Sequence, residues 1–142
     1  MDTVILPSLT YGSETWALTK HQKGKLAAAQ RSMERSILNV TLKDKIRNDV
    51  IRERTKVKDV IKETREKKSR WAGHVARMEN HRWAKITTEW TPREGRRARG
   101  RPKRRWRDEV EEEIGAHWMQ VAQNREAWRR MWRQSASSGV NS

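Results

Sequence analysis

Residues Arg93–Arg107 read REGRRARGRPKRRWR, and this stretch divides the sequence into two helical regions. Nine of its fifteen residues are Lys or Arg and one is acidic, so it carries eight of the chain's fifteen net positive charges. Gly95, Gly100 and Pro102 interrupt helical structure in its first part. A flexible cationic backbone between helices suits phosphate contact, although many charge runs are merely solvated. We predict that this stretch contacts nucleic acid.

The division predicts the organisation of the whole chain. Apolar residues recur every three or four positions on both sides of the basic stretch, which is the period of amphipathic helices. The expected fold class is all-α: several short amphipathic helices with a small Trp-rich core and a basic flexible connector. We expect a helical region over residues 1–92, the connector over 93–101, a second helical region over 102–134 and a disordered tail over 135–142.

The composition limits the core and excludes several classes of site. Hydrophobic residues make up 34% of the chain, and Trp supplies eight of its nine aromatic residues. Soluble domains usually contain ~45–50% apolar residues, so the core must be small. The absence of cysteine excludes disulfides and Cys-based zinc sites, and the four His lack ligand spacing. We expect no cofactor, no metal, no membrane partner, and a nuclear or cytoplasmic location.

The first long helix is predicted over residues 20–38. Thr19 and Gln22 form a capping-box pattern at its start. Its outer face, which includes Glu34, is expected to meet solvent or a ligand. Apolar positions at helical spacing define the inner face: Leu26, Ala29, Met33, Ile37 and Val40.

The second long helix is predicted over residues 59–78. Gly73 in its middle lowers helix stability, which indicates a close approach of another helix. We assign Trp71 to the core rather than to base stacking. The apolar positions are Val60, Ile61, Thr64, Trp71, Val75 and Met78. The side assigned to solvent or ligand carries Lys62, Arg65, Lys67, Lys68, Arg70 and Arg77.

Shorter elements fill the rest of the chain. Thr3–Tyr11 is expected to be a strand or an irregular segment. Asn48, Asn80 and Asn124 are candidate caps for three short helices, the first ending at Arg54. Their apolar positions are Val50, Ile51, Trp83, Ile86, Trp90, Trp128, Met131 and Trp132.

One more helix is predicted directly after the basic stretch. Pro102 suits its first turn, and Gly115 ends it. Trp106, Val110 and Ile114 recur every fourth residue along it. Its acidic residues complement the helix dipole and are placed to pair with nearby arginines at i, i+4. These acidic residues are Asp108, Glu109, Glu111, Glu112 and Glu113, and the arginines are Arg104, Arg105 and Arg107.

Six strings occur in an order that resembles a known family. They are LTYGSETWALT (Leu9–Thr19), RSMERSIL (Arg31–Leu38), IRNDVIRERT (Ile46–Thr55), RWAGHVARM (Arg70–Met78), GRPKRRWRDEV (Gly100–Val110) and AQNREAW (Ala122–Trp128). Together they resemble the C-terminal region of non-LTR retrotransposon endonuclease–reverse transcriptases, after the polymerase palm and into the thumb and beyond. The resemblance covers nearly the whole chain.

The resemblance implies a nucleic-acid-binding role without catalysis. In that family RNA-directed DNA synthesis requires paired aspartates in a Tyr/Phe-x-Asp-Asp string, which this sequence lacks. The endonuclease motifs and the Cys/His zinc knuckle of some lineages are also absent. The chain therefore resembles a fragment or truncated copy, and residues 1–92 its thumb-like part. The implied role is to hold RNA and/or DNA beside the rest of the polypeptide.

The candidate contacts are basic residues in the connector and on the second long helix. They are Arg96, Arg97, Arg99, Arg101, Lys103, Arg104, Arg105, Lys67, Lys68 and Arg70. Three alternatives remain open. Residues 99–102 (Arg-Gly-Arg-Pro) resemble an AT-hook, which would make the chain an architectural DNA-binding protein. A small nuclease could use Asp108 with Glu112 to bind Mg²⁺. The chain could also be an inert remnant.

Overall fold

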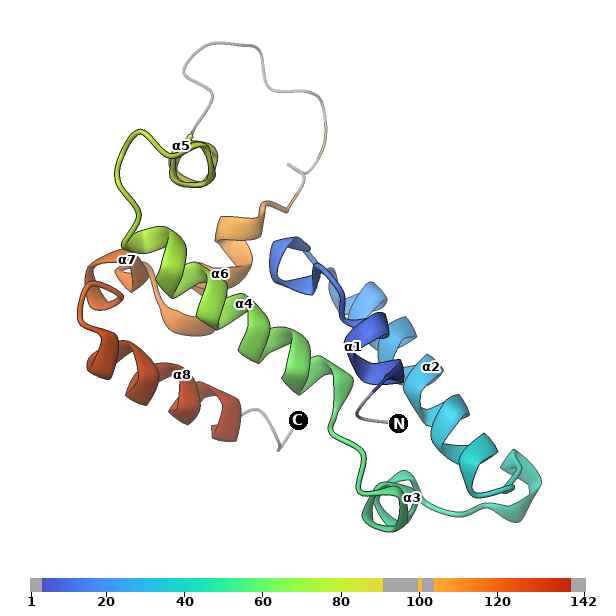
Figure 1. The fold of residues 1–142 in the computed structure, drawn as a ribbon. Coiled ribbons are helices and arrows are strands. Elements are labelled where there is room, and N and C mark those ends of the chain that lie inside the picture. The colour runs from blue at the N-terminus through green and yellow to red at the C-terminus, as the bar shows by residue number, and fades with distance from the viewer. Residues whose placement is uncertain (1–3, 91–99, 101–103, 139–142) are drawn as a thin grey trace.

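The computed structural model describes residues 4–90, 100 and 104–138, with the side chains of 135–138 excepted. Every regular element there is helical, which confirms the all-α prediction (Figure 1). The α-helices are α1 (Ile5–Leu9), α2 (Lys20–Ile37), α3 (Asn48–Thr55), α4 (Val60–Ala76), α5 (Trp83–Glu89), α6 (Trp106–Ile114), α7 (Trp118–Val121) and α8 (Arg125–Ser138). Two 3₁₀ turns, η1 (Ser13–Thr15) and η2 (Leu42–Asp44), complete the set.

Helix α4 is the central element of the fold. It contacts η1, α2, α5, α6, α7 and α8, and in Figure 1 α6–α8 lie on one side of it and α1–α2 on the other. The predicted solvent face of this helix is wrong at Lys68, whereas Lys62 and Arg70 are exposed and the other three predicted positions are partly buried. Lys68 is buried on the same stripe as Thr64 and Ala72, at intervals of four residues.

The Trp-rich core lies where α4, α6, α7 and α8 meet. Trp118 is 1% exposed and Trp128 is 3% exposed, and they pack against Val110 and three alanines. Their ring centroids are 6.2 Å apart, within the usual range for aromatic pairs. The small side chains Ala72, Ala76 and Ala122 make room for the two indoles. The prediction of a small core rich in Trp is therefore confirmed.

Gly73 allows α8 to approach α4 closely, as its position in the sequence predicted. A Cβ atom at Gly73 would lie 2.5 Å from the Trp128 Nε1 atom. The same Nε1–H donates a hydrogen bond of 3.0 Å to the backbone oxygen of Ser69. Glycine at this position therefore lets the Trp128 indole lie directly against the α4 backbone.

The buried face of α2 differs from the predicted apolar face. Gln30 and Glu34 are buried, whereas Ile37 is 54% exposed. The Gln30 side chain donates to the Lys58 oxygen (2.6 Å) and accepts from the Val60 nitrogen (2.8 Å). These bonds satisfy backbone groups just before and at the start of α4, where no intrahelical partner exists. Polar contacts, not only apolar periodicity, therefore set the rotation of α2.

The N-terminal segment is helical, so the expected strand or irregular segment is wrong. Pro7 lies in the first turn of α1, where the missing N–H has no intrahelical partner to lose. Hydroxyl groups then reinforce this short helix: Ser8 Oγ donates to the Val4 oxygen and Thr10 Oγ1 to the Leu6 oxygen, each at 2.8 Å.

Helix boundaries were predicted with mixed success. The Thr19 capping box is confirmed, and Asn124 Oδ1 accepts from the backbone nitrogens of the first turn of α8. Asn48 is instead the first residue of α3, with Arg47 at the N-cap. Asn80 precedes Arg82, which is the N-cap of α5. Neither asparagine caps its helix as predicted.

Two boundaries lie closer to the basic stretch and the C-terminus. Helix α6 begins at Trp106 rather than at Pro102, because the Asp108 carboxylate accepts from the Arg105 nitrogen and caps the helix there (2.8 Å). Helix α8 continues to Ser138, so the tail predicted from residue 135 is wrong for its first four positions. Residues 91–99, 101–103 and 139–142 lie outside the described residues.

Candidate nucleic-acid interface

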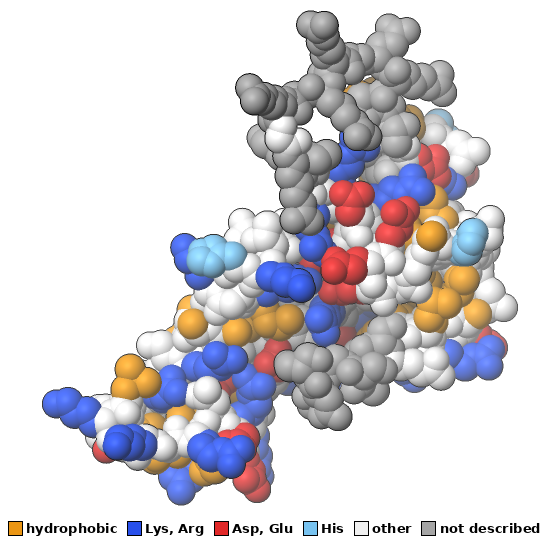
Figure 2. Space-filling model, turned by 180° about the vertical axis from the view of Figure 1, so that it is seen from behind, with side chains coloured by type: hydrophobic (Ala, Val, Ile, Leu, Met, Phe, Trp, Pro, Cys, Tyr) orange, Lys and Arg blue, Asp and Glu red, His pale blue; other side chains and the backbone are white. Residues whose placement is uncertain are grey.

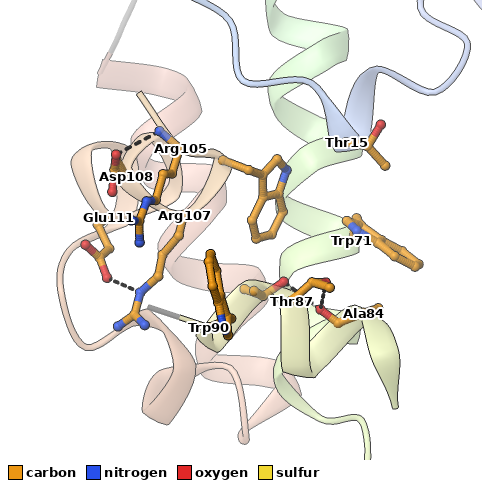
Figure 3. Close-up of a pocket in the computed structure, with 11 residues that line it drawn as sticks. Thr15, Trp71, Ala84, Thr87, Trp90, Arg105, Arg107, Asp108 and Glu111 are labelled. Atoms are coloured by element: carbon orange, nitrogen blue, oxygen red, sulfur yellow. Dashed lines mark hydrogen bonds and ion pairs between the residues drawn. The ribbon is translucent and has the colours of Figure 1, made fainter. Parts of the chain in front are cut away.

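A cavity of about 790 Å³ opens where η1, α4, α5 and α6 meet. Three indoles line it: Trp71 of α4, Trp90 at the end of α5, and Trp106 at the start of α6. We call it the Trp cavity. In Figure 3 the labelled Trp90 lies at the end of α5, and the Trp71 side chain extends outward from α4. An aromatic lining of this kind can stack against a flat, unsaturated ring.

A second hollow of about 540 Å³ adjoins the Trp cavity. Its lining includes Tyr11, Lys67, Arg70 and His74, together with Trp71. We call it the Lys67 hollow. Trp71 therefore forms part of both walls, and its ring centroid lies 5.5 Å from that of His74. The Lys67 hollow therefore places the cationic side chains of Lys67 and Arg70 in one wall with the indole of Trp71.

The tryptophans of the cavity differ in how firmly they are held. Trp106 is partly buried, and its Nε1–H donates to the Glu14 oxygen at 2.6 Å. Trp90 is 63% exposed. Trp71 is partly buried but does not belong to the core cluster, so its assignment to the core is not confirmed. Helix α5 contains no buried residue, and its predicted apolar positions Trp83 and Ile86 are also exposed.

Charged groups at the rim come mainly from α6 and its N-cap. Arg105 is exposed, and Arg107 Nε lies 2.6 Å from Glu111 Oε1 (Figure 3). Arg104 pairs with Glu112. The predicted i, i+4 pairing is confirmed for Arg107 with Glu111, whereas the partner of Arg104 lies eight residues along the chain.

Two residues that flank the basic segment, Trp90 and Arg105, line the Trp cavity. The fourteen residues between them contain seven Lys or Arg and one Glu. Five predicted contacts lie in this segment but outside the described residues: Arg96, Arg97, Arg99, Arg101 and Lys103. Gly100, which is described, is exposed and has φ +111°, a backbone conformation that favours glycine.

The predicted contacts on α4 fall into different environments. Lys67 Nζ donates to Thr10 Oγ1 (2.7 Å) and to the Thr10 oxygen (3.1 Å). Arg70 is exposed and lies 3.2 Å from Glu66. The prediction that Lys68 contacts nucleic acid is wrong. Lys68 is 4% exposed and pairs with Glu109, so its ammonium is not available to a phosphate.

Lys68 and Glu109 belong to a buried ionic cluster that joins α2, α4 and α6. Lys23 Nζ lies 2.6 Å from Glu109 Oε1, and the Leu18 nitrogen donates to Oε2 at 3.1 Å. Burial alone would raise the pKa of Glu109, but hydrogen bonds from Lys23 and Lys68 outweigh it and lower the pKa. Burial also lowers the pKa of Lys68, a shift that Glu109 only partly offsets. The spacing of Lys68 from Thr64 and Ala72 could have revealed this burial from the sequence.

A second basic surface was not singled out in the sequence. Figure 2 shows Lys and Arg side chains gathered over the end of the molecule that contains η2 and α3. Lys45 and Lys56 end these two elements in left-handed backbone conformations, with φ of 49° and 52°. The exposed cations of this surface are Lys43, Lys45, Arg47, Arg54, Lys56 and Lys58. The density of cations over residues 43–58 is the feature of the sequence that could have indicated this surface.

The described residues offer no metal centre. No group of three or more His, Cys, Asp or Glu in that part of the chain could hold a metal ion. The nuclease candidates are separately engaged: Asp108 accepts from the Arg105 nitrogen, and Glu112 pairs with Arg104. Among the described helices, none has the length and apolar character needed to cross a bilayer.

Comparison with known proteins gives one informative similarity. No protein-family model matches the chain, and no solved structure matches it significantly. The chain is 34% identical over 140 residues to a transposon-derived protein of Caenorhabditis elegans. The match covers 89% of this chain and 50% of the relative, so the chain spans about half the length of the curated relative that it matches. This similarity indicates a transposable-element origin.

Proposed function

We propose that the chain is a nucleic-acid-binding C-terminal segment of a non-LTR retrotransposon reverse transcriptase. The observation that carries this proposal is that Trp90 and Arg105, which flank a strongly basic segment of the sequence, both line one aromatic cavity. The similarity to a transposon-derived protein supports the transposable-element origin that this proposal requires. RNA and/or DNA is the proposed partner, together with the rest of such a polypeptide.

The physical basis of binding is neutralisation of phosphates by the connector. Each phosphate contact releases condensed counterions, so affinity falls steeply as salt increases. Such contacts position a strand but read little sequence. The basic surface over η2 and α3 would add contacts of the same kind.

The test is a salt titration of the full chain on duplex DNA and single-stranded RNA. Replacing Arg96, Arg97, Arg99 and Arg101 with Ala should flatten the log–log slope by roughly 0.9 per lost contact on duplex and roughly 0.7 on a single strand. Part of the slope should persist because the surface over η2 and α3 is intact. The matched control removes four exposed cations from α2 and α8: Lys20, Lys25, Arg129 and Arg130. Equal slopes in the fourfold connector variant and the wild type would overturn the proposal.

The AT-hook alternative gives a different pattern in the same titration. Gly100, between Arg99 and Arg101, is exposed and has the positive φ that only glycine adopts readily. If the hook were the function, Arg99→Ala with Arg101→Ala would abolish a preference for A·T-rich over G·C-rich duplex. Single strands would then bind poorly to the wild type as well.

We expect the chain alone to have no polymerase or nuclease activity. The sequence has no paired-aspartate palm string, and Asp108 and Glu112 are engaged by different arginines. A primer-extension assay and a cleavage assay with Mg²⁺ or Mn²⁺ should both remain at background. Cleavage that disappears in Asp108→Asn or Glu112→Gln would instead support the nuclease alternative.

A further inference from the structure

We propose that the Trp cavity holds an unpaired nucleobase, so that the chain binds single-stranded nucleic acid in preference to duplex. The strand would lie along the Lys67 hollow, pass Trp71 and place one base in the cavity beside Trp90. This inference rests on the proposed function and specifies its ligand.

The size and lining of the cavity fit a flat heterocycle. Its volume of about 790 Å³ lies within the range of about 300–1,000 Å³ that small-molecule sites occupy. Indole faces stack against any nucleobase, because every base has a π-face. Thr87, Asp108 and the exposed Arg105 add polar groups to the wall. A ring with an apolar face and polar edges matches such a lining.

Packing in the core does not account for the positions of Trp71 and Trp90. Trp118 and Trp128 fill the core and are almost fully buried. Trp90 remains 63% exposed, and Trp71 lies between two hollows instead of within the core cluster. Large aromatic side chains left open beside cations are a recurrent arrangement in proteins that bind single strands.

Charge complementarity favours a nucleic acid over another aromatic ligand. Lys67 and Arg70 line the hollow on one side of Trp71, and Arg105 and Arg107 line the Trp cavity on the other. Phosphates on either side of a stacked base could therefore meet cations on both sides of the indole. In a duplex the base faces are covered by neighbouring pairs, so only an unpaired base can reach Trp71.

The experiment measures affinity of the full chain for U12, dT12 and a 12-base-pair duplex by fluorescence anisotropy. Trp71→Ala and Trp90→Ala should each weaken single-strand binding by about tenfold, the scale of losing one stacked base. Duplex affinity should stay within about twofold, and the salt slope should not change because stacking releases no counterions. Trp83→Ala is the matched control, since Trp83 is 79% exposed on α5 and does not line the cavity.

Two further arms separate stacking from a folding defect and RNA from DNA. Trp71→Phe keeps an aromatic face and should recover most of the affinity that Trp71→Ala loses. An abasic nucleotide at every position of the oligonucleotide should remove the difference between wild type and Trp71→Ala. The ratio of U12 to dT12 affinity identifies the preferred strand.

The outcomes distinguish the inference from the proposed function. If the wild type binds single strands and Trp71→Ala and Trp90→Ala lose no more affinity than Trp83→Ala, the base site is wrong and the nucleic-acid-binding proposal stands. Equal losses on single strands and duplex would also overturn the base site. If the wild type binds none of the three ligands, the proposed function itself fails.

Discussion

Gly73 gives the most direct test at the scale of a single residue. Alanine is preferred over glycine in a helix by about 1 kcal/mol, but a Cβ atom here would lie 2.5 Å from Trp128 Nε1 and 2.8 Å from Cδ1. The rigid indole is packed against α4 and cannot yield without moving α8. We expect Gly73→Ala to lower the free energy of unfolding by about 1–3 kcal/mol, the usual cost of overpacking.

The control for this prediction is Gly24→Ala in α2. No heavy atom lies within 4 Å of a Cβ built at Gly24, so only the helix preference of alanine should act, raising stability by up to about 1 kcal/mol. Urea unfolding followed by far-UV circular dichroism measures both variants. Stabilisation of both to the same extent would show that α8 does not pack against Gly73.

Glu34 provides a pH-dependent prediction at the same scale. Burial raises its pKa above the ordinary value of 4.5, although Arg52 nearby acts in the opposite direction. The folded state therefore binds this proton more readily than the unfolded state, so Glu34 contributes stability as pH falls through its raised pKa towards 4.5. Glu34→Gln should be more stable than the wild type at pH 7, with a smaller advantage at pH 5. Lower stability of Glu34→Gln at pH 7 would contradict the prediction.

At the scale of elements, the ionic cluster tests how α2, α4 and α6 are joined. Lys68 and Glu109 side chains are 5% and 2% exposed, and Lys23 of α2 pairs with the same carboxylate. Removing one partner of a buried pair usually costs about 3–5 kcal/mol, because the other charge stays buried. We expect Glu109→Gln to destabilise by this amount, since it leaves two ammonium groups without their shared carboxylate.

The control for the cluster is a surface pair on the same helix. Arg107 and Glu111 of α6 are about one-third exposed, and such pairs contribute about 0–1 kcal/mol. Glu111→Gln should therefore change the free energy of unfolding by less than about 1 kcal/mol. If both variants gave the same small effect in urea unfolding, Glu109 would not bind the three helices together.

At the scale of elements, the sequence predicted where the two long helices lie but not which face of each is buried. Helical spacing and the Thr19 capping box located α2 and α4, because these signals depend on local chemistry. Which face is buried depends on what packs there, and periodicity alone could not show that Gln30 would bind the start of α4. Trp71 was assigned to the core for the same reason. Its helical spacing was correct, but its neighbours form two hollows.

The whole molecule combines a small core with a large excess of positive charge. The connector's composition indicated a candidate interface from sequence, but only the structure shows that the flanking residues Trp90 and Arg105 line one cavity. The cavity could not be predicted, because its three indoles are at least sixteen residues apart in the sequence and belong to different elements. The basic surface over η2 and α3 was also missed, since acidic residues are interspersed among its cations.

Net charge gives the last prediction, which concerns the stability of the entire fold. A charge of +15 on 142 residues produces self-repulsion that disfavours the compact state, and added salt screens it. The buried Lys68–Glu109 pair is shielded from solvent and should be little affected. We expect the melting temperature to rise by a few degrees between 20 and 200 mM NaCl, corresponding to roughly 1 kcal/mol at about 2–4 °C per kcal/mol for a chain of this size.

Differential scanning calorimetry on the wild type and on the variant with Arg96, Arg97, Arg99 and Arg101 changed to Ala would measure this effect. The variant has four fewer positive charges, so its melting temperature should be higher at 20 mM NaCl and should rise less with salt. The fourfold control on α2 and α8 should shift in the same direction, because net charge is the cause. A melting temperature that falls as salt is added would show that exposed ion pairs such as Arg70–Glu66 outweigh the repulsion.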